Sequence, residues 1–211
     1  MWIRPAQFFH PFQRYYRVSI LAPCPARTIR LKIADILTTI RLLLIFPVVG
    51  GLANPDFISG LFLLILILIA IVTDYFDGVV ARATRTTSAR GQLFDHGTDF
   101  LFVTTGLASC AYSGVTNLYL PPLIVVAFSQ YVLDSYYLFR QKELRMSALG
   151  RWNGIFYFSP LLIIPFARLG LGQDFKDILE LLAALIAWIL VITTILSIVD
   201  RSIAPLHKSK S

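Results

Sequence analysis

The chain has 211 residues, of which 56% are apolar and 15% are charged. Ordinary globular proteins contain about 45–50% apolar and about 25% charged residues, so the composition excludes a disordered chain, a disulfide scaffold and a soluble nucleic-acid-binding domain. The formal net charge of +7 has a simpler source in the basic loops of a membrane protein than in a nucleic-acid partner. Cys24 and Cys110 have no metal-binding spacing. The composition therefore predicts an integral membrane protein.

The first 32 residues are rich in arginine and aromatic side chains and contain no acidic residue. This mixture suits a helix that lies against anionic lipid headgroups, and a poorly ordered basic leader is an equally good interpretation. The segment lacks the continuous apolar stretch of a signal peptide, so nothing in it indicates cleavage. We treat residues 1–32 as a juxtamembrane segment ahead of the membrane domain.

Six apolar runs follow, each close to the roughly 20 residues that a helix needs to cross a bilayer core. They span residues 33–52, 57–80, 93–112, 118–139, 153–169 and 178–199. We predict an all-α integral membrane protein with a six-helix domain over residues 33–200 and a short basic tail over residues 201–211. Nearly all basic residues outside the runs fall in the N-terminal segment, the second and fourth connections and the tail. The positive-inside rule places these parts and both termini in the cytoplasm.

Four aspartates flank the cytoplasmic ends of the second and third predicted crossings. Asp74 and Asp77 are three residues apart, and Asp95 and Asp99 are four apart, so each pair projects from one face of its helix. The chain reverses direction between the pairs, so two antiparallel helices can bring these faces together. Hard oxygen ligands at this density suit Mg²⁺ or Mn²⁺. Two such ions would clamp the attacking and leaving oxygens of a phosphoryl displacement.

Other interpretations of the cluster are open. The aspartates can cap helices and pair with loop arginines, which explains one aspartate better than four on two matched faces. Intramembrane carboxylates also mark the ion paths of cation transporters, but this cluster lies at one interface and no acidic relay leads to the other. An intramembrane aspartyl protease needs two aspartates on facing helices, but it does not need the small residues and the arginine that accompany the aspartates here.

Small residues accompany the aspartates. Gly78, Ala81 and Gly91 allow close approach of a second helix or of a flat ligand, and each taken singly is better explained by helix packing. Arg82, one turn beyond Gly78, carries a guanidinium that fits phosphate oxygens in bidentate fashion. A phosphate-bearing ligand is therefore a candidate for the space beside the carboxylates.

The stretch from Asp74 to Arg82, with Gly91, Asp95 and Asp99 after it, resembles the signature of the CDP-alcohol phosphotransferases at every defined position. That signature is D-x-x-D-G-x-x-A-R, eight residues, then G-x-x-x-D-x-x-x-D. The resemblance extends to the six-helix layout and covers residues 33–199. Members of this family move a substituted phosphate from a CDP-linked donor to an alcohol hydroxyl and release CMP, and they tend to form homodimers.

The resemblance implies a role for each signature residue. Two divalent ions, Mg²⁺ or Mn²⁺, would be held by Asp74, Asp77, Asp95 and Asp99. Asp99 would also act as the general base toward the acceptor hydroxyl. The cytidine and pyrophosphate of the donor would contact Gly78, Ala81, Arg82 and Gly91.

The acceptor is less well defined. His96 and Phe100 stand where bacterial phosphatidylglycerophosphate synthases usually have Pro and Lys, and the stretch around His96 is similar to one in the longer choline- and ethanolaminephosphotransferases. We expect phosphatidyl transfer from CDP-diacylglycerol to a small polar alcohol, with transfer of a phosphoalcohol to diacylglycerol as the alternative. Arg140 and Arg151 lie where related synthases bind the phosphate of a phosphorylated acceptor, although the positive-inside rule alone also explains them.

Overall fold

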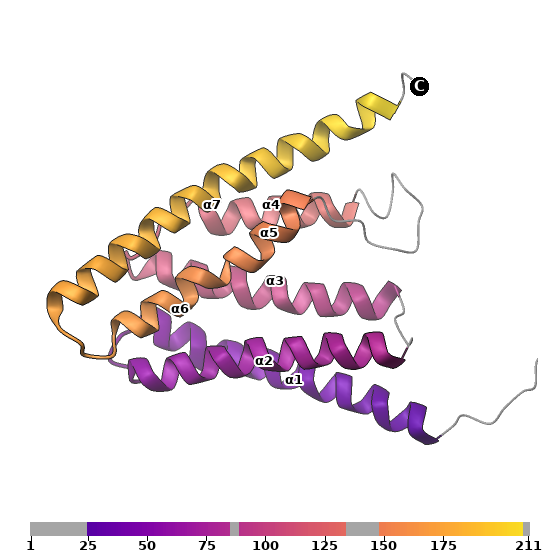
Figure 1. The fold of residues 1–211 in the computed structure, drawn as a ribbon, viewed down its shortest axis with the longest axis horizontal. Helices are drawn as coiled ribbons and strands as arrows, with labels where there is room; N and C mark the ends of the chain where they lie inside the picture. The colour runs from indigo at the N-terminus through magenta and orange to yellow at the C-terminus, as the bar shows by residue number, and fades with distance from the viewer. Residues whose placement is uncertain (1–24, 85–88, 134–147, 209–211) are drawn as a thin grey trace, which may run out of the picture.

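The computed structural model describes residues 25–84, 89–133 and 148–208, and within them the side chains of residues 36–75, 96–133 and 149–203. The regular secondary structure in this part of the chain is all helical, which confirms the predicted all-α class (Figure 1). Its helices are α1 (Pro25–Ala53), α2 (Gly60–Thr84), α3 (Ala89–Tyr112), α4 (Leu120–Leu133), α5 (Ala148–Phe156), α6 (Phe158–Ala167) and α7 (Gln173–Lys208).

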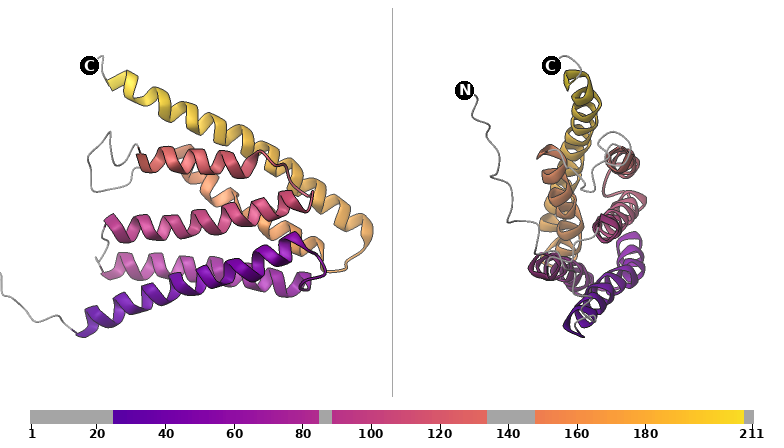
Figure 2. Two further views of the ribbon diagram at one scale, coloured as in Figure 1. Left: turned by 180° about the vertical axis from the view of Figure 1, so that it is seen from behind. Right: turned by 90° about the vertical axis from the view of Figure 1, so that its right-hand side faces the viewer.

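Successive helices alternate in direction, except that α6 continues along the line of α5 (Figure 1). The C-terminal ends of α2, α4 and α7 and the N-terminal ends of α1, α3 and α5 therefore lie at the same end of the bundle. Seen end-on, α3 and α4 lie on one side and α5, α6 and α7 on the other, with α1 and α2 below them (Figure 2). Helix α1 packs against both α2 and α3, and α7 packs against α4, α5 and α6.

The helices extend beyond several predicted boundaries. Helix α1 begins at Pro25, ahead of the predicted crossing, and α7 continues through the predicted tail to Lys208. The predicted fifth crossing, 153–169, is divided between α5 and α6 at Tyr157. Pro160 explains the break, because proline has no N–H to donate to the carbonyl four residues earlier and its ring crowds that carbonyl.

Membrane-crossing potential is clearest at the two ends of the described chain. The stretches Ile36–Ala53 and Gln173–Ile203 are long and apolar enough to cross a membrane, and Gly60–Tyr75 and Leu120–Leu133 are apolar but shorter. The count of six crossings therefore stays a prediction. The outer faces of these helices carry exposed apolar side chains, such as Phe46 at 77% and Ile178 at 63% exposure. Such faces suit contact with lipid rather than water.

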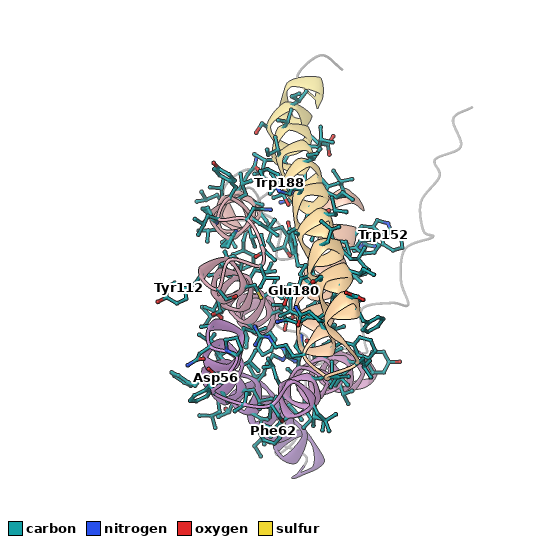
Figure 3. All side chains as sticks on the ribbon, turned by 90° about the vertical axis from the view of Figure 1, so that its left-hand side faces the viewer. Asp56, Phe62, Tyr112, Trp152, Glu180 and Trp188 are labelled. Atoms are coloured by element: carbon teal, nitrogen blue, oxygen red, sulfur yellow. The ribbon has the colours of Figure 1, made fainter. Side chains whose placement is uncertain are left out.

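Aromatic side chains with polar groups lie on the outside of the bundle near helix ends. Tyr112, the last residue of α3, and Trp152 of α5 project outward (Figure 3) and are 82% and 59% exposed. Tyrosine and tryptophan favour the boundary between hydrocarbon and headgroups, so these positions are typical of interfacial anchors.

The end of the bundle away from the aspartates is held by close packing and one arginine. Gly60 begins α2 against the end of α6, where an added Cβ would lie 2.7 Å from Cβ of Arg168. The Arg168 guanidinium donates to the carbonyl oxygens of Gly51 at 2.6 Å and Leu52 at 3.3 Å. These carbonyls lie in the last turn of α1 and lack helical partners, so Arg168 ties α1 to α6.

Candidate active site

One arginine joins two of the signature aspartates. Arg41 of α1 is only 1% exposed, and its Nη2 lies 2.8 Å from Oδ1 of Asp74 on α2. Its Nη1 donates to Oδ1 of Asp99 on α3. The side chains of Asp74 and Asp99 remain 38% and 27% exposed. The structure thus brings these two carboxylates together, with a guanidinium from a third helix contacting both.

The position of Arg41 follows from the cost of burying a charge. Arg41 lies inside the apolar stretch of α1, and a buried cation is tolerated only where anions and hydrogen-bond acceptors surround it. The guanidinium presents its donors in a fixed planar fork, so one arginine can bind carboxylates from two helices at once. Because α1 packs against both α2 and α3, it is the element that can supply this bridge.

A cavity of about 770 Å³ lies beside the two carboxylates, between α2, α3, α4, α5, α6 and α7. Asp74 and Asp99 form part of its wall, whereas Arg41 lies behind them and does not line it. Most of the wall is apolar or aromatic, with contributions from Ile71, Val103, Ile124, Ala127, Phe156, Phe158 and Leu162. The cavity therefore combines an acidic edge with walls that suit hydrocarbon.

One wall is a stack of aromatic rings. Phe100 of α3 and Phe128 of α4 are stacked, with ring centroids 4.1 Å apart. Tyr131 of α4 contacts Phe128 and packs edge-on to His96, with centroids 6.0 Å and 6.4 Å away. The guanidinium carbon of Arg201 lies 4.9 Å from the centre of the Tyr131 ring. This cation–π contact holds a positive charge from α7 against the cavity wall.

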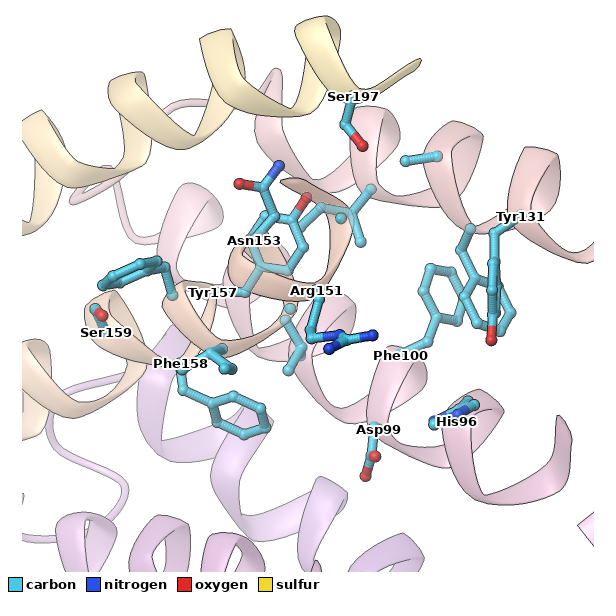
Figure 4. Close-up of a pocket in the computed structure, with 18 of the residues that line it drawn as sticks. His96, Asp99, Phe100, Tyr131, Arg151, Asn153, Tyr157, Phe158, Ser159 and Ser197 are labelled. Carbon is cyan, nitrogen blue, oxygen red and sulfur yellow. The ribbon is translucent and has the colours of Figure 1, made fainter. Parts of the chain in front are cut away.

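Polar groups from α5, α6 and α7 complete the cavity. Asn153 and Ser197 line it and are 4% and 5% exposed. Tyr157, between α5 and α6, shares a 2.7 Å hydrogen bond with Thr194 of α7. Arg151 of α5 is an exposed residue that lines the cavity between Asn153 and Asp99 in the view of Figure 4. Two cationic groups, those of Arg151 and Arg201, thus face the same space as the carboxylates.

For the remaining predicted site residues, the structure describes either the backbone alone or neither backbone nor side chain. Asp77, Gly78, Ala81 and Arg82 belong to α2, and Gly91 and Asp95 to α3, but their side chains are outside the described set. Arg140 lies outside the described residues altogether. Among the described side chains no group of three or more metal-ligating residues occurs. That set includes only two of the four signature aspartates.

The chemistry of the donor set fits a hard divalent cation. Asp74 and Asp99 supply partly exposed carboxylate oxygens at the edge of a cavity. Asp77 and Asp95 lie about one helical turn from them on the same two helices. Carboxylate oxygens are the ligands that Mg²⁺ and Mn²⁺ prefer.

Two charged residues at this site were not predicted from the sequence. No role was expected for Arg41, although an arginine well inside an apolar run requires a partner, and that requirement was the available signal. Arg201 was expected in the tail, but α7 continues to Lys208 and Arg201 lines the cavity.

Comparison of the sequence with protein-family models matches residues 31–198 to the CDP-alcohol phosphatidyltransferase family. Comparisons with curated proteins and with solved structures give no significant match. The family match covers well over half of the chain and includes all the signature residues. It also includes every helix that lines the cavity, except for the last residues of α7. The chain belongs to the CDP-alcohol phosphatidyltransferase family of membrane phosphotransferases that act in phospholipid synthesis.

Proposed function

We propose that this protein transfers the phosphatidyl group of CDP-diacylglycerol to the hydroxyl of a small polar alcohol and releases CMP. The observation that carries the proposal is the meeting of Asp74 and Asp99 at the edge of a largely apolar cavity. A lipid-linked pyrophosphate has an anionic group and long hydrocarbon chains in one molecule. The acidic edge of the cavity suits the anionic group through bound cations, and the apolar walls suit the hydrocarbon chains.

The proposed orientation places the reaction at the cytoplasmic face. Six crossings with both termini in the cytoplasm put the C-terminal end of α2 and the N-terminal end of α3 on that side, together with the basic loops. The domain of residues 33–200 would carry the activity, flanked by the juxtamembrane segment 1–32 and the tail 201–211. A homodimer is expected from the tendency of the family.

In the proposed site, Asp74, Asp77, Asp95 and Asp99 hold two divalent cations. When bound, the cations neutralise the pyrophosphate and stabilise charge on the transferring phosphoryl oxygens. Gly78, Ala81 and Gly91 leave room for the cytidine, and Arg82 contacts the phosphates. These assignments rest on the family signature and on the place of the residues along α2 and α3.

The proposed reaction is an exchange of one phosphorus–oxygen bond for another. The acceptor hydroxyl oxygen attacks the phosphorus attached to diacylglycerol, and the bond between that phosphorus and the oxygen of CMP breaks. The proton of the hydroxyl passes to the carboxylate of Asp99, which acts as general base. Asp99 lines the cavity and is partly exposed, so an acceptor in the cavity can reach it.

The acceptor we favour carries a phosphate. Arg151 and Arg201 both line the cavity, and guanidinium groups bind phosphate oxygens in bidentate fashion. Arg140 remains a candidate for the same role on sequence grounds alone.

Replacing Arg151 with Gln should raise the KM for a phosphorylated acceptor about 10-fold or more, because a hydrogen bond between two charged groups is lost. The KM for CDP-diacylglycerol should stay unchanged, and an equal loss with a neutral acceptor would make Arg151 structural.

The second candidate is transfer of phosphocholine or phosphoethanolamine to diacylglycerol. The aromatic wall of Phe100, Phe128 and Tyr131 favours it, because such rings bind quaternary ammonium groups. However, Arg201 already places a positive charge 4.9 Å from the Tyr131 ring. A second cation there would be repelled, so the first candidate accounts better for the arginines.

The experiment that tests the proposal compares two aspartate variants. Asp99→Asn should abolish CMP release while CDP-diacylglycerol still binds, because the base is lost and the remaining carboxylates are kept. Asp56→Asn is the matched control, since Asp56 is exposed in the loop between α1 and α2. Normal CMP release by Asp99→Asn would refute the base assignment. Cation flux into liposomes without any CMP release would favour a transporter instead.

A further inference from the structure

The contacts of Arg41 point to a role that the family signature does not contain. Its side chain belongs to α1, outside the signature stretch of α2 and α3, yet it contacts Oδ1 of both Asp74 and Asp99. It is almost completely buried and does not line the cavity. Arg41 therefore lies behind the two carboxylates, whereas substrate and cations would approach them from the cavity.

We propose that Arg41 is a positioning residue that holds Asp74 and Asp99 at the spacing needed to bind a divalent cation, a role that rests on the proposed function. Ligating carboxylates are commonly oriented by hydrogen bonds from groups behind them, and loss of such a partner weakens metal binding about 10–100-fold. Here a single guanidinium links ligands on two different helices. The spacing of α2 and α3 at the site is thus tied to α1.

The charge of Arg41 fits the same role. Four carboxylates and a pyrophosphate carry about six negative charges, and two divalent cations supply four positive ones. Arg41 adds a fifth positive charge and brings the site, with its cations and pyrophosphate bound, closer to neutrality. Because Arg41 is buried and does not line the cavity, it can orient the carboxylates without occupying the place of a cation bound in the cavity.

The geometry of the guanidinium makes lysine the informative replacement. Arg41→Lys keeps the buried positive charge, which favours folding, but an ammonium is a compact charge without a planar fork. The ammonium lacks the two separate Nη groups through which Arg41 contacts Asp74 and Asp99, so we expect it to hold the two carboxylates together less well. Arg168→Lys is the matched control, because Arg168 also bonds to a second helix, through the carbonyls of Gly51 and Leu52, at the opposite end of α1.

The test measures Mn²⁺ binding to the purified full-length protein by electron paramagnetic resonance, with CMP release and thermal unfolding measured in parallel. Arg41→Lys should raise the dissociation constant for Mn²⁺ about 10-fold or more and lower kcat. Arg168→Lys should lower the unfolding temperature and leave Mn²⁺ binding unchanged. Arg41→Gln, which removes the charge, should also bind Mn²⁺ more weakly than the wild type.

Three results would overturn the inference. Wild-type Mn²⁺ affinity in Arg41→Lys would refute positioning by the fork. Tighter Mn²⁺ binding in Arg41→Gln would show that Arg41 mainly repels the cation. Failure of the wild-type protein itself to bind Mn²⁺ would refute the proposed metal site and, with it, the role of Arg41. If the wild type binds Mn²⁺ and the Arg41 variants bind it equally well, only the positioning role of Arg41 is refuted.

Discussion

The shared guanidinium makes the stability effects of Asp74→Asn and Asp99→Asn strongly non-additive in metal-free protein. At an effective dielectric constant of about 20, each carboxylate attracts Arg41 by about 4 kcal/mol at a charge separation of about 4 Å, and the two carboxylates repel each other by about 3 kcal/mol at about 6 Å. Removing one carboxylate loses one attraction and relieves the repulsion, so each single variant should lose only about 1 kcal/mol. Removing both carboxylates loses both attractions and relieves the one repulsion, so the double variant should lose about 5 kcal/mol of unfolding free energy.

The assay is the free energy of unfolding in mixed detergent micelles with a chelator present, measured for the wild type, both single variants and the double variant. The expected coupling energy is about 3 kcal/mol, and partial exposure of the carboxylates scales all terms down together. The exposed Asp56→Asn variant should stay within about 0.5 kcal/mol of the wild type. A double variant that loses only the sum of the two single losses would refute the shared ion pair.

Two further predictions concern packing. Gly60→Ala should destabilise the protein by about 1–3 kcal/mol, because its Cβ would lie 2.7 Å from Cβ of Arg168 and 2.8 Å from a backbone oxygen of the same residue. Gly97→Ala, whose Cβ would meet nothing within 4 Å, should be neutral or stabilising in thermal unfolding, and equal losses for the two variants would contradict the packing argument. Tyr157→Phe should lose about 1 kcal/mol in the same assay, because it removes the 2.7 Å hydrogen bond to Thr194. An unchanged unfolding temperature would show that this bond contributes nothing.

The sequence was sufficient to predict a helical fold and the convergence of two signature aspartates. Apolar runs of helical length and the spacing of the aspartates are local patterns, and they led to α2, α3 and the meeting of Asp74 with Asp99. The division of the fifth run at Tyr157 was not predicted, although Pro160 three residues later supplies a physical cause.

The contacts of Arg41 and Arg201 were not predictable in the same way. Whether Arg41 reaches both aspartates depends on the rotation of α1 and on its packing against α2 and α3, and hydrophobicity along the chain does not determine either. Arg201 lines the cavity because α7 remains helical beyond the predicted sixth run, 178–199, and packs against α4. A cluster assembled from separate helices depends on tertiary packing, whereas the spacing within a helix is set locally.

The most direct test of the proposed activity is CMP release by the purified protein with Mg²⁺ and CDP-diacylglycerol. The acceptors to compare are glycerol-3-phosphate, inositol, inositol phosphate, serine and phosphatidylglycerol. We predict CMP release that requires both Mg²⁺ and an acceptor, with a phosphorylated acceptor preferred. CMP release only from CDP-choline or CDP-ethanolamine with diacylglycerol would favour the second candidate, and no release from any donor by folded protein would contradict the proposed activity.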